Sequence, residues 1–353
     1  MDLFLQYQAY CEAAGLAAAA FTTFRRVMKS VFKHHLRMRD RGDFGQCDVC
    51  HRLRKRIRNA TSKASKALSV RLYSQHLLQQ WSDRQFYWNH RTSSRNYFAQ
   101  TLHFSKKLSG SDIASSIITV IQDGMDQAKL RLPKWGYAKL SKAATKLYRP
   151  ATHLVASWVH GYRLFLYVSD EDLKKNSETQ IECLCLSLQD LFDQCSSMAL
   201  TLHLQQDNCP REGKNRFVIG LMLLLQILGI YRFTSLGYLR TSHSHDDVDQ
   251  VFGQIGRLLM GKTCQSANEM IALLEDCIQQ GQPSEKSGRI RGSVATTNKL
   301  DQVSCWKKYV GQMGVTFKGL RHVHYMRFSC WLLSRNEGTM ENDNDHELPF
   351  MDS

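Results

Sequence analysis

Eight apolar segments between residues 117 and 260 limit the fold more than any other feature of the chain. They are, in chain order, a β-branched run at 117–121, alternating runs at 153–160 and 162–168, a helical run at 181–195, an alternating run at 199–206, a helical run opened by Pro210 and capped by Asn208, an apolar run at 231–239 and a helical run after 243–249. Period-two and period-3.6 patterns separate strands from helices. The resulting order predicts an α/β fold with a mixed five-stranded sheet flanked by helices.

Three aspartates stand at matching points of this series. Asp123 ends the first predicted strand, Asp207 follows the fourth, and Asp249 lies near the start of the final helix. A ribonuclease-H-like fold presents its acids in this order, and hard divalent cations prefer carboxylate oxygens. Cleavage and transfer of phosphodiester bonds use two such cations about 3.5–4 Å apart. The sequence therefore predicts a Mg²⁺ or Mn²⁺ site formed by these three aspartates.

Strand parity and nearby residues refine this prediction. Side-chain alternation places Asp207 on the polar face of its strand with His203 and Gln205, opposite the leucines. The alternatives are Asp126 for the first acid, Asp246 or Asp247 for the third, and His243 and His245 as added ligands or turn residues. Each acid also has an ordinary explanation, because aspartate is common in turns and at helix starts.

Basic residues are concentrated in the first part of the chain. Residues 1–150 contain 27 Lys and Arg against 9 Asp and Glu, whereas the remaining residues contain 20 against 23. The net charge of +15 therefore arises in the first part. This segregation is typical of a module that binds a polyanion, although a basic surface also favours solubility.

Two short helices are predicted at the start of the chain. Residues 3–13 have helical spacing, Gly15 interrupts the pattern, and residues 18–32 resume it with Thr and Arg on the side opposite the apolar residues. This is typical of a helix-turn-helix, and also of any helix hairpin with a basic face. Arg25, Arg26 and Lys29 are the expected phosphate contacts.

A Cys-x-x-Cys pair follows this region. Cys47 and Cys50 have the spacing with which two thiolates hold one tetrahedral Zn²⁺, and His34, His35 and His51 are nearby candidates for the other ligands. Without a second Cys-x-x-Cys in the chain, the pair fits two ordinary cysteines at a helix start as well as zinc. The 11 cysteines are odd in number and irregularly spaced, which favours a reducing, intracellular compartment over a disulfide framework.

A basic amphipathic helix is predicted at 51–71. This stretch has eight basic residues, no acid, and apolar residues at helical spacing from Leu53 to Leu68. Its expected contacts with a nucleic-acid backbone are Arg52, Arg54, Lys55, Arg56 and Arg58. The same cluster is compatible with a nuclear-localisation signal, so a nuclear location is expected.

The remaining segments complete the predicted organisation. The longest apolar run, at 218–230, is shorter than the about 20 residues that a membrane span needs, so no membrane association is expected. The predicted parts are a helix pair with the cysteine knuckle at 1–60, a basic helical segment at 61–110, the α/β core at 111–280, a polar loop at 281–301, accessory helices at 302–335 and an acidic disordered tail at 336–353.

Three strings in the predicted core occur together: DGMDQAK at 123–129, DNCPREGKN at 207–215, and HSHDDVDQVFG at 243–253. With them the chain resembles a group of transposon-derived proteins that have a DDE-transposase-like, ribonuclease-H-like core. The knuckle at 44–50 and the helix pair containing FTTF at 21–24 look like their usual N-terminal neighbours, so the resemblance covers residues 1–335. It implies a metal-dependent transposase core with Asp123, Asp207 and Asp249 as catalytic acids, and Lys214 of the second string is a secondary candidate. The third acid departs from the commonest pattern, because it is Asp where Glu is usual.

Three functions are compatible with these features. The leading prediction is a DNA transposase or transposase-derived nuclease with Mg²⁺ or Mn²⁺ at the aspartates, one structural Zn²⁺, and DNA as partner, with further copies of the chain as an option. The alternative is a catalytically inactive, domesticated DNA-binding protein that retains the fold. A third is a metal-dependent hydrolase of RNA or a small phosphoester. Catalysis requires the three carboxylates to converge.

Overall fold

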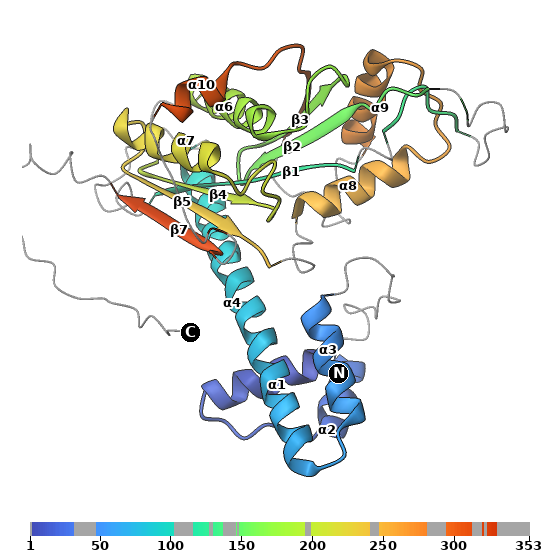
Figure 1. Cartoon of the computed structure of the whole chain (residues 1–353), viewed down its shortest axis with the longest axis vertical. Helices are drawn as coiled ribbons and strands as arrows, with labels where there is room; N and C mark the ends of the chain where they lie inside the picture. Colours follow the sequence, from blue (N-terminus) through green and yellow to red (C-terminus); the bar gives the residue numbers. More distant parts are fainter. Residues whose placement is uncertain are drawn as a thin grey trace, which may run out of the picture.

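The structure is a computed structural model of the 353-residue chain. It describes residues 2–31, 47–101, 116–126, 130–136, 146, 148–194, 199–240, 247–280, 294–312, 320 and 323–329. Figure 1 shows a helical region at one end, a sheet covered by helices at the other, and one long helix that belongs to both.

Seven strands form one mixed sheet in the order β6-β3-β2-β1-β4-β5-β7. The strands are β1 (Ile117–Gly124), β2 (His153–Val159), β3 (Arg163–Ser169), β4 (Thr201–Gln206), β5 (Phe233–Tyr238), β6 (Val294–Lys299) and β7 (Tyr325–Ser329). β1, β2 and β3 are antiparallel neighbours, whereas β4 and β5 run parallel to β1. At the edges, β6 is parallel to β3 and β7 is antiparallel to β5. The predicted α/β class with a mixed sheet is confirmed, with seven strands in place of five.

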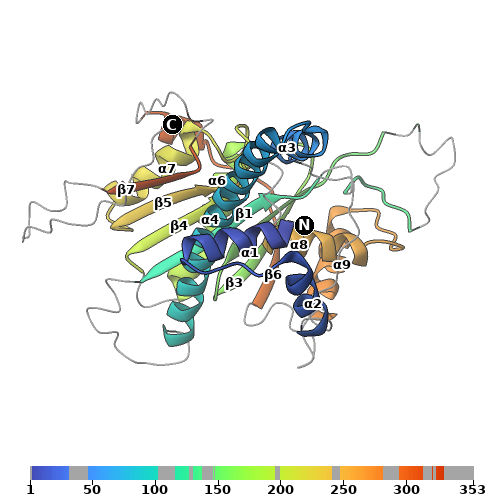
Figure 2. The same cartoon turned by 90° about the horizontal axis from the view of Figure 1, so that it is seen from below.

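Helices cover both faces of this sheet (Figures 1 and 2). The helices are α6 (Ser177–Gln194), α7 (Arg216–Ile227) and α10 (Trp306–Gly311) on one face, and α8 (Asp247–Leu258), α9 (Ala267–Gln280) and the second half of α4 (Lys63–Thr101) on the other. Val120 and Leu204 face α6 and α7, whereas Ile121 and Leu164 face α8 and α9. The central strands are therefore buried on both sides, which explains their nearly continuous apolar sequences.

The long helix α4 joins the two ends of the molecule. Its 39 residues give a length of about 58 Å at 1.5 Å per residue. The first half packs on α1 (Asp2–Ala13) and α3 (Asp48–Asn59), and the second half packs on β1. Ser94 anchors the second half, because its Oγ donates to the His160 carbonyl at 2.7 Å and accepts the Thr119 N–H at 3.1 Å.

The two predicted N-terminal helices are present as α1 and α2 (Phe21–Val31). Gly15, between them, has a φ of +66°, a left-handed conformation that glycine adopts without steric cost. Aromatic rings join the pair, since the Phe4 ring centroid lies 5.1 Å from that of Phe21 and 5.3 Å from that of Phe24.

The prediction of one continuous basic helix at 51–71 is wrong. α3 ends at Asn59, where Ala60 becomes extended, and α4 begins at Lys63. Ser62 favours the restart, because its Oγ accepts the Ser65 N–H at 3.2 Å in the manner of an N-cap. The predicted apolar stripe ends at the break, and Leu68 is 59% exposed.

The predicted start of the helix after β4 is also wrong. Pro210 lies in a turn in which the carbonyl of Cys209 accepts the N–H groups of residues 212–214. α7 begins at Arg216, because the Asn215 side chain accepts the N–H groups of the second and third helical residues at 3.1 and 3.2 Å. Asn215 is therefore the cap, and Asn208 is not.

Two predictions at the C-terminal end need correction. Residues 294–299 of the predicted polar loop form strand β6, and residues 325–329 of the predicted accessory helices form strand β7. Both strands are held by backbone pairing at the sheet edges, which polar side chains do not prevent. The predicted acidic tail at 336–353 lies outside the described residues. Among the helices that the structure describes, none is both long and apolar enough to cross a membrane.

Candidate functional site

Asp123 and Asp207 lie at the same end of the sheet, where the central strands β1 and β4 finish. The parallel register of β1 and β4 pairs Gln122 with Gln206, and each aspartate directly follows its glutamine in the sequence. By side-chain alternation, both belong to the face covered by α4 and α8. Each carboxylate accepts the N–H of its following residue at 2.7 Å. The two predicted acids are therefore neighbours on adjacent parallel strands.

The third predicted acid, Asp249, lies in the first turn of α8. Val248 and Phe252 of this helix are buried in the apolar cluster that includes Ile121 of β1, so α8 runs beside the strand that carries Asp123. Asp249 and Asp207 both act electrostatically on Asp123. Asp207 and Asp249 thus both lie within electrostatic range of Asp123.

Asp123 is the electrostatic centre of this group. Burial, together with the negative charges of Asp207 and Asp249, raises its pKa from 3.8 to about 7, against the opposing effects of the Gly124 N–H and of Lys175. Burial and nearby like charges both disfavour the ionised carboxyl. Burial is thus the main reason that the Asp123 carboxyl holds its proton to a higher pH than a free aspartate.

The three carboxylates are not tightly clustered. Within the described part of the chain, the group of three ligand atoms that all lie within 4.8 Å of one another is formed by Cys47, Cys50 and His76. The oxygens of the three aspartates are more widely spaced than this.

An ion pair supports the end of β1. Lys175 Nζ lies 3.3 Å from Glu212 Oε2 and donates to the Gly124 carbonyl at 3.2 Å. A Cβ atom at position 124 would overlap the end of the Lys175 side chain, so a larger residue there would displace this flexible lysine. Gly124 of DGMDQAK thus leaves room for the lysine side chain, and Glu212 of REGKN forms an ion pair with it.

Lys214, a secondary candidate from the sequence, supports the turn after Asp207. The residue is 5% exposed, and its Nζ donates to Asn208 Oδ1 at 2.8 Å and lies 5.1 Å from the Tyr238 ring centroid. Burial lowers the pKa of Lys214. Lys214 is therefore a buried residue that holds Asn208, the residue that follows Asp207.

The other secondary candidates are placed differently. Asp126 is exposed, two residues beyond the end of β1. His243, His245 and Asp246 lie outside the described residues. Asp247, an alternative for the third acid, contacts Tyr87 and Arg91 of α4.

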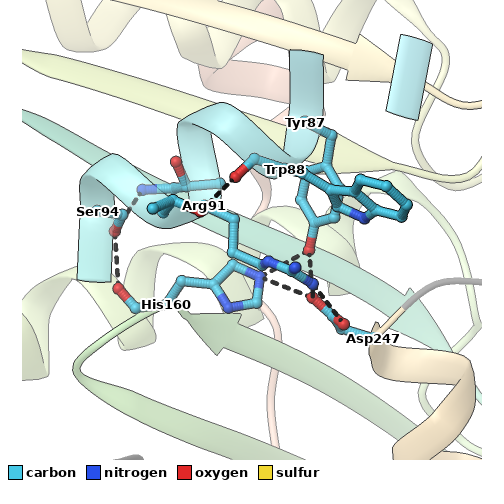
Figure 3. Close-up of polar contacts among 8 residues, drawn as sticks. Tyr87, Trp88, Arg91, Ser94, His160 and Asp247 are labelled. Carbon is cyan, nitrogen blue, oxygen red and sulfur yellow. Dashed lines mark hydrogen bonds and ion pairs between the residues drawn. The ribbon is translucent and has the colours of Figure 1, made fainter. Parts of the chain in front are cut away.

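Figure 3 shows these contacts of Asp247. Arg91 Nη1 donates to its two carboxylate oxygens at 2.8 and 2.6 Å, and the Tyr87 hydroxyl donates at 3.0 Å. His160 Nε2 lies 2.6 Å from the Tyr87 hydroxyl. Burial lowers the pKa of His160 well below its usual value, which keeps the ring neutral. Asp247 therefore fixes the start of α8, two residues before Asp249, to α4.

Sequence reasoning did not assign roles to Lys175, Glu212, Tyr87, Arg91 or His160. Glu212 was visible in the REGKN string, whereas Arg91 and Asp247 are separated by 156 residues and share no local pattern. Only the packing of α4 against the sheet brings that pair together.

The Cys-x-x-Cys pair acquires a neighbour that the sequence prediction missed. Cys47 precedes α3, Cys50 lies one turn inside it, and Cys47 Sγ is 3.3 Å from His76 Nε2 on α4. His34 and His35, the predicted ligands, lie outside the described residues, and His51 is exposed. Burial and the neighbouring Cys47 raise the pKa of the Cys50 thiol to about 11.

The predicted DNA contacts are mostly accessible. Exposed side chains belong to Arg25 and Arg26 on α2 and to Arg52, Lys55, Arg56 and Arg58 on α3. Arg54 differs, because its Nε donates to the Tyr73 hydroxyl at 2.8 Å and its guanidinium lies over the same ring. Lys29 lies in α2, but its side chain is outside the described part of the structure.

Comparison with known proteins gives one family match and several remote structural matches. A family model with the description "Domain of unknown function (DUF7869)" matches residues 142–340, more than half of the chain. The crystal structure of the Mos1 strand transfer complex is similar at 12% identity over 78% of this chain and 88% of that chain, with a TM-score of 0.29. The Mos1 transposase paired-end complex with left transposon end is similar at 13% identity over 76% and 83%, with a TM-score of 0.30. TM-scores this low support no conclusion about fold or activity. No curated protein matches the chain.

Proposed function

The chain belongs to the family described as Domain of unknown function (DUF7869), and we propose that it is a DNA transposase or a transposase-derived nuclease. The observation that carries this proposal is the grouping of Asp207 and Asp249 around Asp123, on which both act electrostatically. The acids come from a strand, a turn after a parallel strand, and a helix start, so three elements far apart in sequence supply one site.

The order of the central strands supports a ribonuclease-H-like core. β3, β2 and β1 form an antiparallel series, and β4 and β5 continue it parallel to β1. In this arrangement the first acid ends the central strand β1 and the second follows its parallel neighbour β4. β6 and β7 are additions at the two edges.

The three aspartates suit divalent cations. Carboxylate oxygens are the ligands that Mg²⁺ and Mn²⁺ prefer, and a bound cation would offset both the burial of Asp123 and the charges of the two neighbouring aspartates. Asp123, Asp207 and Asp249 would hold the cations. Such cations would supply Lewis-acid stabilisation of the oxygens that attack and leave a phosphodiester.

Several residues of the chain position the three acids. Asp123 must lose its proton to become a ligand, and its pKa of about 7 places that loss near neutral pH. Lys175 fixes the backbone next to Asp123 through the Gly124 carbonyl. Arg91 and Tyr87 hold the helix start that presents Asp249. These groups are therefore positioning residues for the acids.

The basic helical end is proposed to hold DNA. Exposed Arg52, Lys55, Arg56 and Arg58 on α3 supply positive charge, and phosphate contacts of this kind release counterions. A nuclear location belongs to the same proposal, since DNA is the substrate.

DNA binding can be tested in the full chain. Replacing Arg52, Lys55 and Arg56 together with Gln should weaken binding. It should also lower the slope of log affinity against log salt by about 0.9 for each phosphate that the protein no longer neutralises. Fluorescence anisotropy across a salt series measures both the affinity and the slope. An unchanged slope would place the DNA elsewhere.

Catalysis can be tested by nicking of a supercoiled plasmid in Mg²⁺ or Mn²⁺. Asp123→Asn, Asp207→Asn and Asp249→Asn should each abolish nicking, whereas the exposed Asp126→Asn is the matched control. Undiminished nicking by Asp207→Asn would remove that residue from the mechanism. If the wild-type chain binds DNA without nicking it, the inactive DNA-binding alternative is favoured.

A further inference from the structure

We propose that Cys47, Cys50 and His76 bind one zinc ion that fastens α3 to α4. The site is separate from the aspartate group, and its existence does not depend on catalysis. The new element is His76, which comes from a different helix than the cysteines and replaces the histidines expected from sequence.

The geometry of the three residues fits a tetrahedral ion. Their ligand atoms all lie within 4.8 Å of one another, with 3.3 Å between Cys47 Sγ and His76 Nε2. Zinc lies about 2.3 Å from sulfur and about 2.0–2.1 Å from nitrogen, which separates two tetrahedral ligands by roughly 3.5 Å. An ion between them would also meet the Gln80 side chain, whose Nε2 contacts His76 Nε2 and lies 3.9 Å from Cys50 Sγ.

The surroundings favour zinc over two unrelated thiols. Cys50 is 5% exposed and belongs to a small apolar cluster with Leu53, Tyr73 and Leu77. Neither cysteine forms a disulfide, and Cys47 directly precedes the first residue of α3. A mixed thiolate and imidazole donor set is typical of structural zinc.

Such an ion would fix the position of the exposed basic residues of α3. α3 and α4 are separated by only three residues, 60–62, and the apolar cluster between them is small. An ion held from both helices would fix the exposed Arg52, Lys55 and Arg56 relative to the helix that continues to the sheet. The three protein ligands leave one position of a tetrahedral ion for a fourth donor.

The metal content of the purified full chain tests the proposal. Inductively coupled plasma mass spectrometry should find one zinc per chain in wild type, and loss of that zinc in Cys47→Ser, Cys50→Ser and His76→Ala. Cys305→Ser and His51→Ala are matched controls, because both residues are exposed and lie outside the cluster. Circular dichroism checks that each variant is folded.

Cobalt substitution distinguishes ligands from neighbours. Cobalt(II) in the wild-type site should give thiolate charge-transfer bands and the intense visible bands of tetrahedral coordination. His76→Cys should retain metal with an added thiolate band, which keeps the test decisive if His76→Ala fails to fold. Any one of three results would overturn the proposal. The wild-type chain could stay metal-free after zinc addition, Cys47 and Cys50 could form a disulfide under reducing conditions, or His76→Cys could leave the cobalt spectrum unchanged.

Discussion

Replacing Asp123 with Asn should stabilise the metal-free protein, and increasingly so as the pH rises. In the folded chain the pKa of Asp123 is raised from 3.8 to about 7 by burial and by the two neighbouring aspartates. Between these values the unfolded chain is ionised at this residue while the folded chain holds the proton. Folded wild type therefore loses stability as the pH rises from about 4 to about 7, and this contribution is constant above 7.

The size of the effect follows from the two pKa values. Each unit of pKa difference corresponds to about 1.36 kcal/mol, so the full cost of ionising Asp123 in the folded state is about 4 kcal/mol. Part of this cost is already present at pH 5. The stability advantage of Asp123→Asn over wild type should consequently grow by about 2–3 kcal/mol between pH 5 and pH 8.

Urea unfolding in the presence of a chelator measures this difference at each pH. Asp126→Asn, which removes an exposed carboxyl from the same DGMDQAK string, is the control and should show no comparable trend. Saturating Mn²⁺ should reverse the order, because the cation stabilises wild type and loses a ligand in Asp123→Asn. An advantage that is independent of pH, or that shrinks as the pH rises, would refute the electrostatic account of this site.

Three further predictions concern the residues around the site. Arg91→Ala should lower the free energy of unfolding by about 2 kcal/mol in urea titrations, since it leaves the carboxylate of Asp247 largely buried without its cation; a decrease below about 0.5 kcal/mol would contradict this. Gly124→Ala should cost less than about 1 kcal/mol, because the flexible end of Lys175 can move away from the added Cβ, and in a double-mutant cycle Lys175→Ala should remove most of that cost, whereas additive costs would exclude the contact. Asn215→Ala should cost about 1 kcal/mol by removing the cap of α7, and an unchanged melting temperature would refute the assignment of the cap.

The central strands and their acids were predictable because the signal is local. A strand buried on both faces must be apolar along its length, so the runs that became β1, β2 and β3 were visible in the sequence. Asp123 and Asp207 interrupt these patterns where strands end. Asp123 and Asp207 then lie close together because neighbouring parallel strands finish at the same end of the sheet.

Other features depend on contacts that a single sequence does not display. β6 consists largely of polar residues and is a strand only because its backbone pairs with β3. His76 lies 26 residues after Cys50 and meets it only because the chain reverses between α3 and α4. The start of α7 was misplaced because two asparagines compete as caps, and the turn at Cys209 decides in favour of Asn215.

The long helix α4 explains how the two proposed binding regions are connected. Its first half carries His76 beside the basic helix α3, and its second half carries Arg91 beside the start of α8. Asp83, between them, forms an ion pair with Arg240 beyond β5 at 2.7 Å. Because these contacts are spread along one helix, a shift of α4 along its axis would strain the Arg91–Asp247 contact, two residues from Asp249. The helical end and the start of α8 are therefore connected directly through the contacts of one helix.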